Sequence, residues 1–510
     1  MKREEKIRFE EVDNQGRTQG KKQPKRQSAD RQKNARGSKK SQNKEFARVT
    51  YFFVILFLAL MTYIVYFNVV RAKTIVNSPY NKRQDAFADR VVRGDITDRN
   101  GNILAETIVY DDGTEERSYP YDDIFAHVVG YSFPSTGKSG VEAAQNFDLL
   151  TSNAFFPEKL MNEFKDQKNM GDTVVTTLDA DLQESAYHAL GESRGAVVVM
   201  EAQTGKILSM VSSPSFDPNQ AESEWDYLNS DDAGSPLLNR ATQGLYAPGS
   251  TFKIITALEF MRENPDYYNY EYDCIGEITH GETTINCFNH TAHGYQDLRS
   301  AVANSCNSAF ADIGLSLNRT SYRETAESLM FNKKLPSVLD YSKSRFEVNE
   351  STPDSELMMT AMGQGQTMVS PYHMALIVSA VANDGVLMNP YLVEKVTNHG
   401  GSEMRKNVPK SYRKLMTPEE AAQLQEYMSA VVTEGTGSML NGESYSVAGK
   451  TGTAEYSIDD GSKTHSWFVG YTGGDDPDLV ISVVIEGNDE NAETKAVPIV
   501  KQILDQYYYR

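Results

Sequence analysis

A serine and a lysine three positions apart could together perform acyl transfer. Pro248-Gly249 interrupts the chain, and Ser250 then begins a helix that continues through the apolar residues of FKIITAL. Three-residue spacing on a helix places the Ser250 and Lys253 side chains on one face. A neutral Lys253 amine could therefore take the Ser250 proton and create a nucleophile. The unpaired N–H groups of the first helical turn could stabilise negative charge on an attacked carbonyl.

Two further motifs strengthen this hypothesis. Ser-x-x-Lys spacing also occurs at Ser41–Lys44 and at Ser411–Lys414, so alone it indicates only a helix start. Ser305-Cys306-Asn307 follows Ser250 in the chain, and Lys450-Thr451-Gly452-Thr453 comes later, at the head of a predicted strand. An early Ser-x-x-Lys, a middle Ser-x-Asn and a late Lys-Thr-Gly form the ordered set of serine enzymes that react with penicillin.

The segments around these motifs predict an α+β fold. From about Asp172 the chain becomes regular, with an Asp-capped amphipathic helix and then two apolar strands in GAVVVMEAQTGKILSMVSS. Strands recur in YSVAGKTGTAEY, SWFVGYTG and LVISVVIEG, and a helix ends the chain. Residues between about 250 and 435 are mostly helical in pattern. Helices inserted between early and late strands predict an antiparallel sheet rather than a βαβ repeat.

An uncharged run of 22 residues, 49–70, predicts a transmembrane helix. As a helix it is about 33 Å long, enough for a bilayer core of about 30 Å. A cleavable signal peptide is the alternative, but the run is too long for one, and Arg71-Ala72-Lys73 follows instead of a small-residue cleavage site. Residues 1–48 contain 16 Lys+Arg and 7 Asp+Glu and few large apolar residues, so we expect a disordered tail.

The charge of that tail predicts the orientation of the span. Positive charge before the first span places the N-terminus in the cytoplasm and the remaining residues outside it. The tail lies directly before an apolar run, which favours the membrane over a nucleic acid as its partner. After the span, RGDITDRNGNILAET contains Asn100-Gly101, a strong signal for a tight hairpin turn. We interpret this hairpin as structural.

The sequence resembles class B penicillin-binding proteins from the apolar run to nearly its last residue. Besides the three motifs, the likeness is carried by RGDITDRNGNILAET, GAVVVMEAQTGKILSMVSSPSFDPN and GQGQTMVSPYHMALIVSAVANDGVLMNPYLV. The resemblance implies a β-rich pedestal over 71–171. It also implies a penicillin-binding transpeptidase domain of the serine β-lactamase type over 172–510, in which helices flank an antiparallel sheet and form a helical subdomain. The implied function is to cross-link peptidoglycan stem peptides in cell-wall synthesis and to be acylated by β-lactams.

The resemblance gives roles to the first two motifs. Ser250 would be acylated by the penultimate D-Ala carbonyl of a stem peptide, and Lys253 would be its base. Ser305 would relay a proton to the leaving D-Ala. Asn307 would hold the substrate amide and the Lys253 side chain. A second stem peptide's amine would then attack the acyl-enzyme, so no cofactor is required for the reaction.

The third motif would bind substrate. Lys450, Thr451 and Thr453, with Gly452 between them, would hold the terminal carboxylate of the peptide or of a β-lactam. Backbone N–H groups of Ser250 and Thr453 would form the oxyanion hole. The resemblance also places Gln364 and Gly365 near the cleft.

Three cysteines in an exported chain leave two specific arrangements open, besides the absence of both. One is a disulfide between Cys274 and Cys287 with a buried Cys306. The other is a closed structural zinc site formed by Cys274, Cys287, His293 and Cys306, a ligand set that suits zinc. Some elongation-type members of the resembled family carry zinc in this region. His290 could substitute for His293 as a ligand, but a solvent-facing position is the favoured interpretation of His290.

Other functions share parts of this pattern. A class D β-lactamase or a β-lactam sensor would also contain Pro-Gly-Ser-x-x-Lys, but a β-lactamase usually has Ser-x-Val where this chain has Ser305-Cys306-Asn307. A bifunctional class A enzyme needs a glycosyltransferase domain larger than residues 71–171. A carboxypeptidase shares the motifs but lacks the class B pedestal. The resemblance also implies a membrane partner, a glycan polymerase of the SEDS family, for which the chain could act mainly as a scaffold.

Overall fold

The computed structural model describes residues 29–71, 90–165, 167–458, 461–474, 476–487 and 496–509. The chain divides into two compact units, Met1–Ile75 and Val76–Arg510. The first unit contains one long helix, α1 (Ala29–Tyr66), followed by a π-helical turn, η1 (Phe67–Arg71). The stretch Phe46–Tyr66 is long and apolar enough to cross a membrane.

Helix α1 differs from its prediction at both ends. Residues 29–48 were assigned to a disordered tail, but they are helical. They are rich in Ala, Arg, Lys and Gln, which have high helix propensity, so the helix of the apolar run extends into them. Residues 67–70 of the predicted span are π-helical instead of α-helical. The rest of the predicted tail, residues 1–28, lies outside the described residues.

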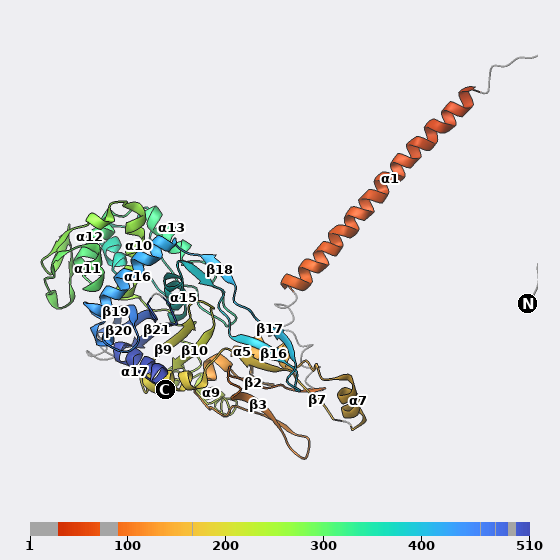
Figure 1. Cartoon of the computed structure of the whole chain (residues 1–510), viewed down its shortest axis with the longest axis horizontal. Helices are drawn as coiled ribbons and strands as arrows, with labels where there is room; N and C mark the ends of the chain where they lie inside the picture. The colour runs from red at the N-terminus through yellow and green to blue at the C-terminus, as the bar shows by residue number, and fades with distance from the viewer. Residues whose placement is uncertain are drawn as a thin grey trace, which may run out of the picture. The chain divides into compact units, whose positions relative to one another are not determined.

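A six-stranded sheet organises the beginning of the second unit (Figure 1), with strand order β17-β16-β8-β2-β3-β4. Its strands are β2 (Ile96–Thr97), β3 (Ile103–Val109), β4 (Glu115–Ser118), β8 (Thr173–Thr176), β16 (Val393–Thr397) and β17 (Glu403–Lys406). The predicted hairpin at Asn100-Gly101 is confirmed. Asp98 closes it by accepting hydrogen bonds from the N–H groups of Asn100 and Asn102, both at 2.8 Å.

The predicted boundary between residues 171 and 172 crosses this sheet. Strand β8 pairs in parallel with β2 and antiparallel with β16, so three strands from beyond residue 172 complete the pedestal sheet. The sheet therefore joins strands of the predicted pedestal, 71–171, with strands of the predicted transpeptidase segment, 172–510, and the domain boundary itself stays a prediction. Local sequence patterns could not show this, because the pairing joins strands that are far apart in the chain.

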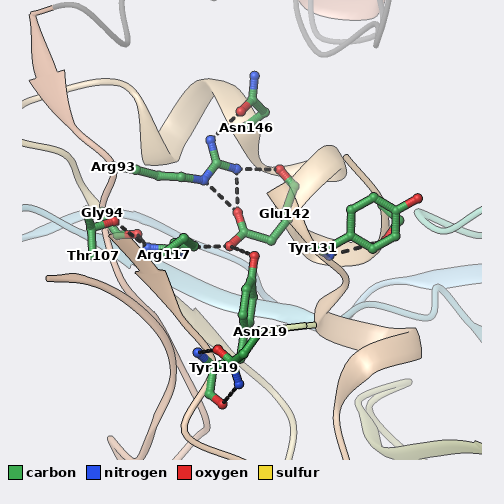
Figure 2. A network of polar contacts seen from close by, with 10 residues as sticks. Arg93, Gly94, Thr107, Arg117, Tyr119, Tyr131, Glu142, Asn146 and Asn219 are labelled. Carbon is green, nitrogen blue, oxygen red and sulfur yellow. Dashed lines mark hydrogen bonds and ion pairs between the residues drawn. The ribbon is translucent and has the colours of Figure 1, made fainter. Parts of the chain in front are cut away.

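A buried ionic network holds the pedestal together (Figure 2). Glu142, on α5 (Gly140–Ala144), is fully buried and accepts hydrogen bonds from Arg93 at 2.6 Å and Arg117 at 2.7 Å. Burial alone would raise the pKa of Glu142, but the Arg117 and Arg93 guanidinium groups outweigh burial and lower it. Glu142 is therefore an ionised carboxylate between two cations. The Tyr119 hydroxyl donates a further hydrogen bond to it at 3.3 Å.

A second sheet of five antiparallel strands forms the centre of the unit. Its order is β10-β9-β21-β20-β19. The strands are β9 (Gly195–Glu201), β10 (Ile207–Ser213), β19 (Val447–Ile458), β20 (Gly461–Thr472) and β21 (Leu479–Glu486). The early and late strands predicted from the sequence thus lie side by side, and the predicted α+β class is confirmed.

Helices cover both faces of this central sheet. Val197 and Val199 of β9 pack in one cluster with α8 (Ala180–Leu190) and α17 (Ala496–Tyr508). Val198 and Met200 point to the other face, in the cluster that contains α15 (Pro371–Ala382). Side chains alternate along a strand, so a strand buried on both faces must be apolar at nearly every position, as GAVVVME is.

The segment between the early and late strands is mostly helical, as predicted. Its helices are α10 (Lys253–Glu263), α11 (Leu298–Ala303), α12 (Asn307–Ser316), α13 (Arg319–Ser328), α14 (Asp354–Ala361), α15 and α16 (Pro418–Thr433). Two small sheets lie between α10 and α11: β11 (Tyr272–Cys274) with β14 (Gly294–Gln296), and β12 (Glu277–His280) with β13 (Thr283–Asn286). The cysteine-containing segment is therefore built on short strands.

Shorter elements complete the unit. They are β1 (Val91–Val92), α4 (Ala126–Val129), β5 (Ser132–Phe133), β6 (Gly137–Lys138), α6 (Asn146–Leu149), α7 (Phe156–Phe164), β7 (Asn169–Met170), α9 (Trp225–Leu228), β15 (Val386–Met388) and β18 (Ser411–Lys414).

Candidate active site

A tight turn presents Ser250 just before α10. Gly249–Phe252 is a 3-10 turn, and α10 begins at Lys253, later than the predicted start at Ser250. Gly249 has φ +53°, a region that favours glycine, and its N–H donates to the Gly363 carbonyl at 2.9 Å. A Cβ at position 249 would lie 2.3 Å from the Thr453 carbonyl oxygen. The turn is therefore packed closely against both β19 and the loop at Gly363.

The Lys253 side chain is buried, and its Nζ has three oxygen acceptors. It donates to the Ser305 carbonyl at 2.6 Å, to the Ser305 hydroxyl at 3.2 Å and to Asn307 Oδ1 at 2.7 Å. Burial lowers the pKa of Lys253 to about 7, although two nearby cysteine sulfurs oppose the shift. A substantial share of the lysine is thus neutral near neutral pH, as a general base requires.

Ser305 lies in a bend between two helices. Helix α11 ends at Ala303, and Cys306 is the N-cap of α12. Ser305 has φ +55°, a left-handed conformation that costs a non-glycine residue about 1–2 kcal/mol. In this conformation both Ser305 oxygens lie within hydrogen-bond distance of Lys253. The bend therefore places the two polar residues of the Ser-x-Asn motif, Ser305 and Asn307, on the same amine.

Lys450 lies on β19 and is also buried. Its Nζ donates to the Thr451 carbonyl at 3.0 Å. Burial, together with the positive charge of Lys253, lowers the pKa of Lys450 well below its usual value. The two lysines are thus close enough to influence each other, and Lys450 would be stabilised by an anionic ligand.

The rest of the third motif contacts the Ser250 turn directly. A Cβ at Gly452 would lie 2.9 Å from Thr251 Cγ2 and 3.1 Å from the Pro248 carbonyl oxygen. The Thr451 and Thr436 hydroxyls share a hydrogen bond of 2.6 Å. Strand β19 and the turn before α10 therefore form one wall of the site.

All three motifs meet in one region. Lys253 bonds to Ser305 and Asn307, and the turn that holds Ser250 packs against Gly452 and Thr453. Among the described residues, no hydrogen bond joins the Ser250 hydroxyl to Lys253. Proton transfer between these two side chains therefore stays a prediction.

Several neighbours of the site have no sequence signal that could have identified them. The Phe310 ring centre lies 5.4 Å from Lys253 Nζ, and Thr436 bonds to Thr451.

Gln364 was expected near the cleft. Its side-chain amide, in the orientation that satisfies both groups, pairs with the Glu455 N–H and carbonyl at 3.2 Å each. Glu455 is on β19, so Gln364 does border the strand of the third motif.

The three cysteines and His293 form a compact cluster next to this site. Their ligand atoms all lie within 4.8 Å of one another, and His290 is not among them. Cys274 Sγ is 3.6 Å from Cys287 Sγ and 3.4 Å from His293 Nδ1, and Cys287 Sγ is 3.8 Å from Cys306 Sγ. All three cysteines are free, whereas a disulfide bond is about 2.05 Å long.

Three ligand pairs, 3.4–3.8 Å apart, have the spacing of a tetrahedral zinc site, and the other pairs lie within 4.8 Å of one another. With zinc–nitrogen and zinc–sulfur bonds of about 2.0–2.3 Å, neighbouring ligands of a tetrahedron lie roughly 3.3–3.8 Å apart. The Ser308 hydroxyl, which the sequence did not indicate, lies 3.1, 3.3 and 3.4 Å from the sulfurs of Cys274, Cys287 and Cys306. The residues present can therefore hold zinc.

Comparisons with known proteins agree with the geometry. Residues 195–505 match the family model for the penicillin-binding protein transpeptidase domain, which is more than half of the chain. Residues 93–174 match the model for the penicillin-binding protein A dimerisation domain. The peptidoglycan D,D-transpeptidase PbpA of Mycolicibacterium smegmatis is 30% identical over 486 residues, covering 89% of this chain and 96% of that protein.

Solved structures show the same fold. The D,D-transpeptidase domain of a peptidoglycan glycosyltransferase from Eggerthella lenta has a TM-score of 0.74 and 31% identity, covering 82% of this chain and 99% of that one. The ceftriaxone acyl-enzyme complex of M. tuberculosis penicillin-binding protein A has a TM-score of 0.75 and 26% identity, covering 83% of this chain and 100% of that one.

Proposed function

The chain belongs to the penicillin-binding protein transpeptidase family and is a class B peptidoglycan D,D-transpeptidase, in which we propose that Ser250 is the nucleophile. The main support is the packing of the Ser250 turn against β19: a Cβ at Gly249 would lie 2.3 Å from the Thr453 carbonyl oxygen. This packing places Ser250 beside the third motif, while Lys253 on the next helical turn bonds to the second.

Acylation begins when neutral Lys253 accepts the proton of the Ser250 hydroxyl. The Ser250 oxygen attacks the penultimate D-Ala carbonyl of a stem peptide, and the N–H groups of Ser250 and Thr453 stabilise the oxyanion. The C–N bond then breaks, and Ser305 donates its hydroxyl proton to the leaving D-Ala nitrogen while it takes up the proton held by Lys253, which becomes neutral again. The amine of a second stem peptide attacks the ester, forms the new amide and returns the proton to Ser250. A β-lactam acylates Ser250 in the same way, but its ring-opened product remains attached.

Substrate orientation depends on the buried charge of Lys450. Burial, together with the positive charge of Lys253, lowers the pKa of Lys450. The terminal carboxylate of a stem peptide or β-lactam supplies a compensating charge, together with hydroxyl groups of Thr451 and Thr453. Carboxylate binding and the protonated state of Lys450 therefore favour each other.

Mass spectrometry of the full chain with a labelled penicillin tests this assignment. We expect one adduct on the Ser250 peptide that persists for many minutes, and none in Ser250→Ala. Ser411→Ala is the matched control, because Ser411 has the same Ser-x-x-Lys spacing but lies exposed on β18. Rapid loss of the adduct with accumulation of hydrolysed drug would instead indicate a β-lactamase. If Ser250→Ala restored growth to a deletion strain, a scaffold function would replace catalysis.

Cys274, Cys287, His293 and Cys306 are proposed to bind a structural zinc ion. Support comes from the ligand spacing and from the contacts of Ser308 with all three sulfurs. Zinc would contribute rigidity here, since a site with four protein ligands has no open position for substrate. Cys306 lies between Ser305 and Asn307, so fixing its sulfur would also fix the left-handed bend that both residues need.

Membrane anchoring by α1 is proposed to leave the N-terminus in the cytoplasm and the catalytic domain outside. Support comes from the 16 Lys+Arg in residues 1–48 and from the length of the apolar stretch. A protease added outside intact cells should remove the catalytic domain and spare the tail. We also propose a SEDS-family glycan polymerase as a membrane partner that supplies the strands to be cross-linked. Co-purification of that polymerase with the full chain, and its loss on replacing residues 49–70, would test this.

A further inference from the structure

Helix α7 has its apolar side chains turned away from the protein. None of its residues is buried. Phe156 and Phe164 are 77% and 84% exposed. The exposed apolar side chains of α7 and its N-cap are Phe155, Phe156, Leu160, Met161 and Phe164. The more covered residues are polar: Lys159 and Asn162 are half-buried, and Asn162 donates to Asn169 at 3.1 Å.

This arrangement is the reverse of an ordinary surface helix, which turns its apolar stripe to the core. Phe156, Leu160 and Phe164 follow each other at four-residue spacing, so they form one continuous stripe. A contiguous exposed apolar patch of this kind marks an interaction surface. The residues that the structure describes leave this stripe exposed.

The length of the connecting segment limits how far β1 can lie from the membrane helix. Strand β7, a few residues after α7, pairs in parallel with β1, where Val91 is opposite Asn169. Residues 72–89 are all that separate β1 and its neighbour Arg90 from Arg71, at the end of the membrane helix. Even fully extended, they reach about 65 Å. A bilayer spanned by α1 is therefore tethered, through residues 72–89, to the unit that carries α7.

We propose that α7 inserts its Phe156–Leu160–Phe164 stripe into the lipid interface as a second, reversible membrane contact of the pedestal. In the sequence, residues 158–168 carry equal numbers of basic and acidic residues, Lys159, Lys165 and Lys168 against Glu158, Glu163 and Asp166. Insertion therefore depends on apolar burial and not on anionic lipids. Together with α1, such a contact fixes the pedestal relative to the bilayer. The proposal depends on the membrane span but not on the chemistry of Ser250.

Fluorescence of the full chain in vesicles tests it. The chain contains two tryptophans, so Phe164→Trp adds a reporter at a highly exposed position. In zwitterionic phosphatidylcholine vesicles we expect blue-shifted emission and roughly two-fold quenching of the added indole by brominated acyl chains. Tyr268→Trp, also at an exposed position but in the catalytic region, is the matched control and should not be quenched.

Every outcome is decisive. Quenching of Phe164→Trp that is lost when Phe156 and Leu160 are both changed to serine supports lipid insertion. Emission that stays water-like overturns the proposal. A blue shift without quenching overturns it in favour of a protein surface, and dependence of that shift on protein density would identify a second copy of the chain. Flotation of the wild-type chain with vesicles is measured separately. If the wild-type chain does not float, the α1 span is refuted, and so is the α7 contact that depends on it.

Discussion

Nζ of Lys253 lies 2.7 Å from Oδ1 of Asn307, which comes 54 residues later in the chain. The amide oxygen is uncharged, so it positions the amine without the strong preference for the charged form that a carboxylate would impose. Burial can therefore bring the pKa of Lys253 down to about 7. This pairing lets one side chain be both held in place and available as a base.

Acylation by penicillin should increase with pH through about 7. Below that pH Lys253 is protonated and cannot accept the Ser250 proton, whereas above it the neutral amine predominates. The second-order acylation rate, measured by mass spectrometry across the pH range in which the chain stays folded, should show one rising inflection. A rate that is flat between about pH 6 and 8 would argue against Lys253 as the base.

Asn307→Asp should move that inflection upward. A carboxylate 2.7 Å from Lys253 stabilises the protonated amine and raises its pKa by about 1–3 units. Acylation at neutral pH should therefore fall about ten-fold or more and recover at high pH. Asn304→Asp is the matched control, because Asn304 bonds to Gln296 and not to Lys253. An equal shift in both variants would show that the effect is not local.

Gly249→Ala should abolish acylation because the turn has no space for the added Cβ. The new Cβ would lie 2.3 Å from the Thr453 carbonyl oxygen, so either β19 or the Ser250 turn must move. Gly442→Ala separates this clash from backbone strain, since Gly442 also has positive φ but has nothing within 4 Å of the added carbon. The control should lose about 1–2 kcal/mol of unfolding free energy and keep its acylation rate. Acylation by Gly249→Ala at the wild-type rate would contradict this packing.

The sequence predicted the parts of the fold that local patterns encode. The doubly buried strand β9 is apolar at every position before its last residue, Glu201, and the Asp179 side chain caps α8 through the Leu182 N–H as its position suggested. The order of three short motifs was enough to predict their convergence around Lys253. These signals depend on residues close together in the chain or on a recognisable combination.

Long-range and backbone features were not predictable. No local pattern in residues 393–406 shows that they complete the pedestal sheet, because pairing partners are chosen by the whole fold. Ser305 adopts φ +55° although serine has no preference for it. The candidate metal ligands could be proposed from their residue types, but Ser308 looks like any helix serine. Only the folded structure shows that its hydroxyl lies within 3.4 Å of three cysteine sulfurs.

The full chain should contain one zinc ion, and Ser308→Ala should weaken its binding. The Ser308 hydroxyl can donate to a metal-bound sulfur, and loss of such outer contacts typically lowers metal affinity about 10–100-fold. Competition with a chromophoric chelator measures the affinity, and Ser316→Ala on the same helix is the control. A chain that is free of metal and about 2 Da lighter than its reduced form would indicate a disulfide between Cys274 and Cys287 instead.

Glu142→Gln should destabilise the pedestal by about 3–5 kcal/mol at neutral pH, because it leaves Arg93 and Arg117 without their buried counter-charge. The pKa of Glu142 is lowered in the folded state, so its contribution is complete above the pKa of an unfolded glutamate and is lost as the pH falls through the folded value. The difference between wild type and variant should therefore shrink in acid. Denaturant unfolding at several pH values measures it, with the exposed Glu158→Gln as control. An equal loss at all pH values would mean that packing, not charge, is responsible.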